Sequence, residues 1–137
     1  MKLWPCCPGC LQRYLRGLRS LRLRPGRKWY VRTWLIVTTE INAFEGSAAM
    51  GLVDIGADVA LAAGKHGSSA RVSGRANREA SRAGLDLAGV MRQVAKVYGG
   101  EGGGHRAAAA LEARGEPAEL LDECRKKVAE TLQPRQA

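Results

Sequence analysis

Apolar positions predict alternating strands and helices from Trp34 onward. Residues 34–38 are β-branched and continuously apolar, which is typical of a buried strand. Small and aliphatic residues then recur on one face of residues 44–53, which predicts a helix. A second strand is expected over residues 58–63. The turn-forming residues 65–68 should return a third strand, 69–75, beside it.

The second half of the chain contains two amphipathic helices. The first is expected over residues 87–98, with Asp86 as N-cap, Leu85 stapled to Val90 and Gly99-Gly100 at its end. Its apolar positions have helical spacing: Leu87, Val90, Met91, Val94, Ala95 and Tyr98. The second helix begins at Pro117 and should bury Leu120, Leu121, Cys124 and Val128. The expected fold class is α/β (α+β), a mixed β-sheet flanked by helices, formed by residues 34–137.

Residues 1–33 differ in charge from the rest of the chain. They hold nine basic residues and no acidic one, whereas residues 34–137 hold 13 of each. The formal net charge of +9 therefore describes a basic N-terminal arm, expected to be disordered or a short helix. Leucines at helical spacing between arginines favour a basic amphipathic helix up to Pro25-Gly26. Such an arm could touch phosphate or an anionic surface, although a frayed or spurious extension is the simpler interpretation.

The cysteines suggest reduced thiols. Cys6, Cys7 and Cys10 lie in the arm and supply half of a tetrahedral zinc site, whose other half is missing. With Cys124 far away, they make a poor disulfide framework, which favours a reducing, cytoplasmic compartment. No apolar run is long enough to cross a membrane, and arginines interrupt the place of a secretory signal core. A structural alternative is that the cysteine-containing arm anchors the chain to a partner or surface.

Two segments have candidate binding chemistry. Alternation along the third strand places Arg71, Ser73 and Arg75 on one face, forming a donor-rich ridge suited to phosphate. A solvated edge strand whose arginines discourage aggregation explains the same spacing. The second segment is a glycine-rich stretch, 99–104, followed by His105, Arg106 and an alanine run.

The glycine-rich stretch is expected to form a loop. An alanine-rich helix beginning near residue 107 would point its first N–H groups at an anion held by that loop. His105 could donate to a phosphate oxygen and assist proton transfer near neutral pH. A flexible linker is the alternative. The stretch is not a Walker loop, since no Lys-Ser or Lys-Thr follows the glycines, and it lacks the preceding strand of a dinucleotide fingerprint.

Both segments resemble motifs of one family. Residues 98–109 resemble the Gly-Gly-Gly-His-x-x-Ala-Ala-Gly signature of the DHH-associated domain (type 1), which accompanies DHH phosphoesterases such as RecJ-type exonucleases and enzymes that degrade very short RNA. Residues 71–75 resemble that domain's Arg-x-Ser-x-Arg strand. The resemblance covers residues 34–132. One departure is Ala110, where the family usually has glycine, which is expected to tighten or shift the chain leaving the loop.

The resemblance implies a nucleic-acid-binding module for single-stranded DNA or RNA or short oligonucleotides. The residues it implies as phosphate or terminal-nucleotide contacts are Ser73, Arg75, Gly103, Gly104 and His105. Arg71 and Gly102 complete the candidate set.

No catalytic residue or cofactor is expected in this chain. DHH enzymes bind manganese through aspartates and histidines, including an Asp-His-His triplet, and these 137 residues contain only His66 and His105 and no such triplet. His66 is expected as an exposed turn residue. The leading hypothesis is a free-standing binding module without catalysis. The alternative is the C-terminal half of a split DHH phosphoesterase or exonuclease that acts with a separate manganese-binding subunit.

Overall fold

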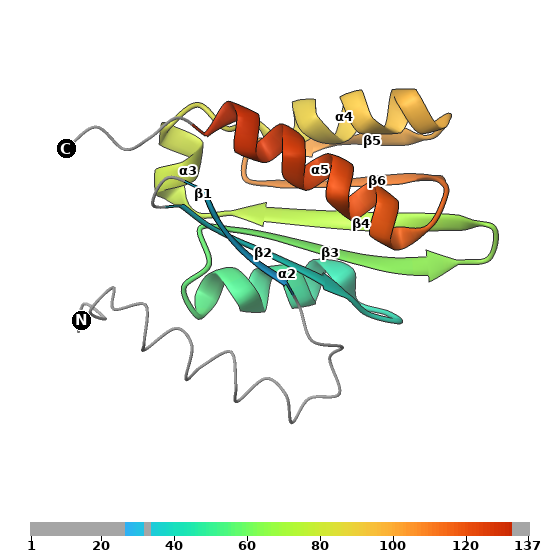
Figure 1. Ribbon diagram of the computed structural model, residues 1–137, viewed down its shortest axis with the longest axis horizontal. Helices are drawn as coiled ribbons and strands as arrows, with labels where there is room; N and C mark the ends of the chain where they lie inside the picture. The colour runs from blue at the N-terminus through green and yellow to red at the C-terminus, as the bar shows by residue number, and fades with distance from the viewer. Residues whose placement is uncertain (1–26, 32–33, 133–137) are drawn as a thin grey trace.

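The computed structural model describes the backbone of residues 27–31 and all of residues 34–132. The elements follow in the order β1 Arg27–Val31, β2 Trp34–Glu40, α2 Glu45–Asp54, β3 Val59–His66, β4 Ser69–Ala76, α3 Arg78–Arg82, α4 Leu87–Tyr98, β5 Glu101–His105, β6 Ala108–Arg114 and α5 Pro117–Thr131. Figure 1 shows this arrangement, with the chain coloured from blue to red.

The six described strands form one mixed sheet in the order β1-β2-β3-β4-β6-β5. β2 and β3 run parallel and are connected through α2, whereas every other neighbouring pair is antiparallel. The predicted mixed sheet flanked by helices is therefore confirmed. β4 lies inside the sheet, between β3 and β6, so its interpretation as a solvated edge strand is wrong.

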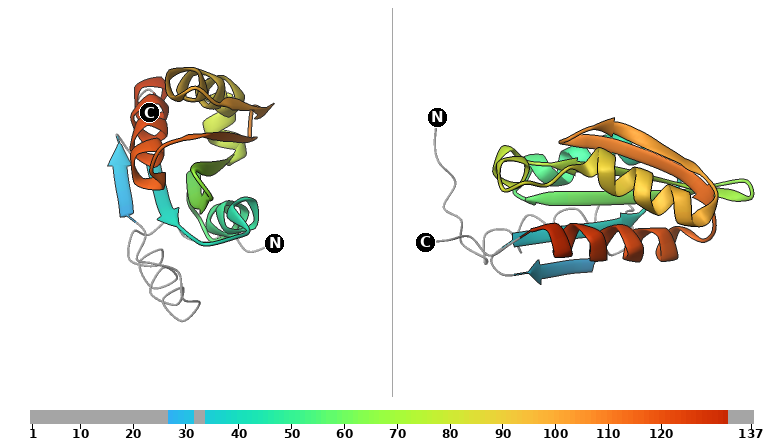
Figure 2. Two further views of the ribbon diagram at one scale, coloured as in Figure 1. Left: turned by 90° about the vertical axis from the view of Figure 1, so that its right-hand side faces the viewer. Right: turned by 90° about the horizontal axis from the view of Figure 1, so that it is seen from above.

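Helices cover the two faces of the sheet unequally. α4 and α5 lie on one side and α2 on the other (Figures 1 and 2). Alternate strand residues such as Ile36, Leu61, Val72 and Leu111 pack under α4 and α5. The opposite face has a smaller core, in which the α2 residues Ala49 and Leu52 lie against β2 and β3. Because α2 contacts β3 and β4, its side of β6 and β5 has no helix packed on it among the described elements.

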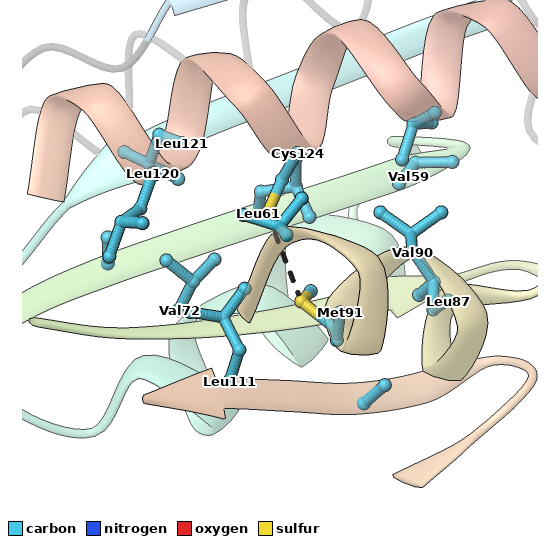
Figure 3. Close-up of a cluster of buried hydrophobic side chains, with 14 of the residues drawn as sticks. Val59, Leu61, Val72, Leu87, Val90, Met91, Leu111, Leu120, Leu121 and Cys124 are labelled. Atoms are coloured by element: carbon cyan, nitrogen blue, oxygen red, sulfur yellow. Dashed lines mark hydrogen bonds between the residues drawn. The ribbon is translucent and has the colours of Figure 1, made fainter. Parts of the chain in front are cut away.

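The larger core includes Cys124, as the helical spacing predicts. Its side chain lies between α5 and α4, with Sγ 4.0 Å from Met91 Sδ (Figure 3). Burial raises the pKa of this thiol to about 12. A thiol reacts as its thiolate, so Cys124 is a small hydrophobic residue here and an unreactive one.

Cys124 is therefore expected to resist a thiol reagent such as dithiobisnitrobenzoate at pH 8 in the folded chain and to react once the chain is unfolded. The measurement uses a variant in which Cys6, Cys7 and Cys10 are replaced by serine, so that Cys124 is the single thiol that can react with the reagent. Rapid labelling under native conditions would contradict the burial of this side chain.

The termini of α4 agree with the sequence except in one detail. The helix spans Leu87–Tyr98 as predicted, and Gly99 ends it in the left-handed conformation with φ 71°. Asp86 occupies the N-cap position, but its side chain makes no capping hydrogen bond. Leu85 and Val90 are both buried in the same core, consistent with the expected staple.

The glycine-rich segment differs most from its prediction. Residues 101–105 form strand β5 rather than a loop, and residues 108–114 form strand β6 rather than a helix. Glycine permits this because β5 approaches α4 closely: a Cβ at Gly102 would lie 2.5 Å from the Met91 carbonyl oxygen. Pairing with β4 and β5 on its two sides overrides the helix preference of the alanine run. The proposed anion site at a helix beginning near residue 107 is thus wrong.

Two further elements were not expected from the sequence. The backbone of Arg27–Val31, within the basic arm, pairs with β2 as strand β1. Asn77 caps the short helix α3, its side chain accepting a 2.8 Å hydrogen bond from the Ala80 N–H. The hypotheses about an amphipathic helix at residues 11–21 and a cysteine-based metal site at residues 6–10 lie outside the described residues. Across residues 34–132, none of the helices has the length and apolar character needed to span a bilayer.

Candidate nucleic-acid interface

The side of the sheet left uncovered beyond α2 gathers most of the candidate residues. Residues directly opposite each other in an antiparallel pair share one face, so the register assigns faces across β4, β6 and β5. We call this face of β4, β6 and β5 the open face, because α2 packs on β4 and no described helix covers this side of β6 and β5. Its members are Arg71, Ser73 and Arg75 of β4, Ala108, Ala110 and Glu112 of β6, and Glu101, Gly103 and His105 of β5.

Two rows of the open face bring the two sequence motifs together. In one row, Ala108 pairs with Arg75 on one side and with His105 on the other. In the next row, Ala110 pairs with Ser73 and with Gly103. Two strand spacings separate Arg75 from His105, about 10 Å between Cα atoms. The small alanine side chains between them leave room for a ligand above the strands.

The side chains of these rows differ in exposure. His105 is exposed, Arg75 is half-buried, and Ser73 is only 7% exposed. Within residues 34–132, neither Arg75 nor His105 forms an ion pair or hydrogen bond with another side chain. A Cβ at Gly103 would meet no atom within 4 Å, so this position faces open space. A guanidinium, an imidazole and a hydroxyl can all donate to phosphate oxygens.

The N-terminus of α2 borders the same rows. A Cβ at Gly46, in the first turn of this helix, would lie 4.0 Å from both Arg75 Nη2 and Ser73 Oγ. The first N–H groups of a helix have no partner within the helix and favour negative charge. This neighbour was not predicted from the sequence. The position of α2 directly after the parallel strand β2 was the available signal, since ligands often bind at the carboxyl ends of parallel strands.

Arg71 has a different environment from Arg75. It is exposed on the open face, but its direct partner on β6 is Glu112, which in turn pairs with Glu101. Its charge also contributes to lowering the pKa of Glu45. Three carboxylates near one guanidinium make this end of the open face unfavourable for an anion. We therefore centre the site on Ser73, Arg75, Gly103 and His105.

Gly102 and Gly104 have structural positions. Alternation along β5 turns them away from the open face, towards the side that α4 covers. Gly104 has φ 136°, which disfavours other residues, and a Cβ there would lie 2.6 Å from the Ala108 carbonyl oxygen. Ala110 lies in the middle of β6 and not at the exit of a loop. The methyl group that replaces the family's glycine therefore stands on the open face, between Ser73 and Gly103.

A part-buried hydrogen bond between Glu45 and His66 fixes the first turn of α2. The Glu45 carboxylate is 5% exposed and lies 2.6 Å from His66 Nε2. Gly64 is needed beside it, because a Cβ there would collide with Glu45 Oε1 and lie 2.7 Å from the Ile41 carbonyl oxygen. His66 is exposed, as expected, but it is the last residue of β3 and a partner of Glu45 rather than a turn residue. The pair holds Gly46 beside Ser73 and Arg75.

Glu45 should make stability depend on pH. Burial raises its pKa, but the hydrogen bond from His66, its own backbone N–H and the charges of His66 and Arg71 outweigh burial, so the pKa is lowered overall. A lowered carboxyl pKa contributes stability above the unfolded value near 4.5, and this is lost as pH falls through the folded value.

His66→Ala is accordingly expected to lower the free energy of unfolding by about 1 kcal/mol at pH 7 and to have little effect at pH 3. Urea unfolding at the two pH values measures this difference. Lys65→Ala is the matched control. It removes the exposed Lys65–Glu116 pair and should change stability by less than about 0.5 kcal/mol. An equal loss from His66→Ala at both pH values would contradict the role of the ion pair.

The described residues contain no group of three or more histidine, cysteine, aspartate or glutamate side chains arranged to hold a metal ion.

A mixed sheet in which one strand separates an Arg-x-Ser-x-Arg strand from a Gly-Gly-Gly-His strand defines the class of DHH-associated domains. Residues 37–133 match the family model described as the DHHA1 domain, and the chain belongs to this family. An uncharacterised protein of Methanocaldococcus jannaschii is 38% identical over 80 residues, which are 57% of this chain and 24% of that protein. The chain therefore spans about a quarter of the length of this relative.

Solved structures share the fold. The C-Ala domain of alanyl-tRNA synthetase from Aquifex aeolicus is similar with a TM-score of 0.59 at 21% identity, covering 77% of this chain and 97% of that one. The DHH domain of a member of a ribosomal protein family has a TM-score of 0.58 at 17% identity, covering 88% of this chain and 30% of that one. The pGpG-specific phosphodiesterase PggH from Vibrio cholerae has a TM-score of 0.52 at 15% identity, covering 90% and 41%.

Proposed function

We propose that this domain binds the backbone phosphate of single-stranded DNA or RNA or a short oligonucleotide on its open face. The observation that carries the proposal is the register, which aligns Ser73 and Arg75 of β4 with Gly103 and His105 of β5 across a floor of alanines. The family membership and structural neighbours named for a tRNA synthetase and a pGpG phosphodiesterase support a nucleic-acid ligand.

Each residue of the site has a distinct task. Arg75 supplies a permanent positive charge and paired donors that fit phosphate oxygens. The His105 imidazole donates a hydrogen bond from the opposite side, and the Ser73 hydroxyl donates from the floor. Gly103 keeps the space above β5 free because it has no side chain. The N–H groups of the first turn of α2 add a partial positive charge next to Arg75 and Ser73.

The direct test is equilibrium binding of a short 5′-phosphorylated single-stranded oligonucleotide to the full chain. His105→Ala should weaken binding by about 10-fold, the loss of one charge-assisted hydrogen bond. Replacing Arg13, Arg16 and Arg19 of the arm with glutamine is the matched control, and it should reduce the salt dependence without removing the effect of His105→Ala. Equal affinity of the wild type and His105→Ala would reject the site.

A second candidate is that the domain acts within a DHH phosphoesterase or exonuclease whose metal-binding part is a separate subunit. The observation favouring it is coverage: the aligned region makes up only 24% of the curated relative and 41% of the phosphodiesterase. The purified chain with manganese should then hydrolyse no oligonucleotide, and adding a DHH subunit should restore hydrolysis. Robust hydrolysis by the chain alone would overturn both candidates.

A further inference from the structure

Phe44 is an exposed aromatic residue beside the proposed site. It is 80% exposed, more than the other exposed large hydrophobic residues of the described part of the chain, Val97 at 76% and Met50 at 47%. Burial in a core therefore does not explain this side chain. Single exposed apolar residues are common on protein surfaces, so exposure alone assigns Phe44 no role, but it leaves the aromatic ring accessible to a ligand.

The backbone of Phe44 is unusual as well. Its φ of 61° and ψ of 41° place it in the left-handed region, and it is the one residue besides glycine with positive φ among those described. A bulky side chain is strained in this conformation, which glycine adopts freely. Such strain is kept where the surrounding structure enforces it, and it clusters at binding sites. Phe44 is also the N-cap of α2 and provides no side-chain capping hydrogen bond.

The position of Phe44 links it to the open face. It directly precedes Glu45, whose carboxylate is held by His66, and lies two residues before Gly46. Gly46 in turn borders Arg75 Nη2 and Ser73 Oγ, each 4.0 Å from the position of its Cβ. The contact between Glu45 and His66 therefore fixes the start of α2, which carries both Phe44 and the Gly46 neighbour of Arg75 and Ser73.

We propose that Phe44 is a stacking platform for a nucleobase of the strand whose phosphate lies at Ser73 and Arg75. This inference rests on the proposed function and adds the recognition of a base to that of the backbone. Every base has a π-face, so an aromatic platform binds single strands with little sequence preference. A base inside a duplex has both faces stacked and cannot use the platform, which therefore favours the unpaired bases of single strands.

The test compares two 5′-phosphorylated oligonucleotides of equal length, one of adenines and one abasic. Phe44→Ala should weaken binding of the adenine oligonucleotide by between about 5-fold and 150-fold and leave the abasic one unchanged. Phe44→Trp should retain the affinity for adenine, whereas Phe44→Leu should lose most of it, because leucine is apolar without being aromatic. Val97→Ala removes a similarly exposed apolar side chain from α4 and is the matched control.

A second variant separates binding from folding. Phe44→Gly relieves the left-handed strain, so its melting temperature should equal or exceed that of Phe44→Ala, while its affinity for the adenine oligonucleotide should fall as far. Equal loss of both oligonucleotides, or no loss of either, would overturn the stacking role. If the wild type binds neither oligonucleotide, the proposed function itself fails. Binding of both with no response to Phe44→Ala rejects this inference alone.

Discussion

Replacing Arg75 with alanine is expected to weaken binding of a 5′-phosphorylated oligonucleotide by roughly 10- to 150-fold. Arg75 is half-buried and has no acidic partner within residues 34–132, and its Nη2, like Ser73 Oγ, lies near Gly46 in the first turn of α2. A charge-assisted hydrogen bond to phosphate at such a position contributes about 1.5–3 kcal/mol, which corresponds to that range. Isothermal titration calorimetry at fixed salt measures the loss.

Two other arginines provide matched controls for Arg75→Ala. Arg71→Ala removes the same charge from the same strand, but beside Glu112, and should weaken binding by less than about threefold. Arg92→Ala removes an exposed charge from α4, on the other side of the sheet, and should leave binding unchanged. If the three variants lose affinity equally, the contribution is general electrostatic attraction and not a contact with Arg75.

The double variant Arg75→Ala/His105→Ala refines the same prediction. If both side chains bind one phosphate, the two losses should not add, because the first substitution already displaces the ligand that the second would release. Full additivity would indicate that the two residues bind different groups.

Adjacent glycines of β5 are expected to respond to alanine in opposite ways. At Gly102, a Cβ would lie 2.5 Å from the Met91 carbonyl oxygen and 3.2 Å from the Arg92 nitrogen, and the backbone of α4 cannot yield easily. Gly102→Ala should therefore lower the free energy of unfolding by about 2 kcal/mol. At Gly103, the Cβ would meet nothing within 4 Å, so Gly103→Ala should change stability by less than about 0.5 kcal/mol.

For oligonucleotide affinity, the order is reversed, and Gly103→Ala is the substitution with the direct effect. The methyl group of Gly103→Ala stands on the open face beside Ala110 and takes space from a phosphate between Arg75 and His105. The affinity of the Gly103→Ala variant for the oligonucleotide should fall severalfold while its fold remains intact. Urea unfolding and oligonucleotide titration of the same two preparations give both results. A destabilised Gly103→Ala variant, or an unperturbed Gly102→Ala variant, would contradict the assigned orientation of β5.

Much of the fold could be predicted from apolar periodicity. The buried strand at Trp34, the hairpin of β3 and β4 and the helices α4 and α5 follow from residues that alternate or recur at helical spacing. The hairpin of β5 and β6 could not be predicted, because glycine and alanine carry almost no periodic signal and alanine favours a helix locally. The conformation of those residues is determined by the pairing of β6 with β4 and by the close approach of β5 to α4, and both are tertiary interactions.

The candidate site was predictable to a similar extent. Strand alternation alone placed Arg71, Ser73 and Arg75 on one face, and the family motifs supplied His105 as their partner. The register was needed to show that Arg71 faces Glu112 and that Gly103, unlike Gly102 and Gly104, reaches the open face. Gly46 lies near Ser73 and Arg75 because α2 packs on β4, which is a tertiary contact.

The most direct measurement is a nuclear magnetic resonance titration of the full-length, isotope-labelled chain with a short 5′-phosphorylated single-stranded oligonucleotide. The backbone amide signals of Ser73, Arg75, Gly103 and His105 should shift together with one dissociation constant, and those of α4 residues such as Arg92 should stay in place. Shifts confined to residues 1–33, with the open face unchanged, would show that the basic arm alone binds the ligand and would contradict phosphate recognition by the domain.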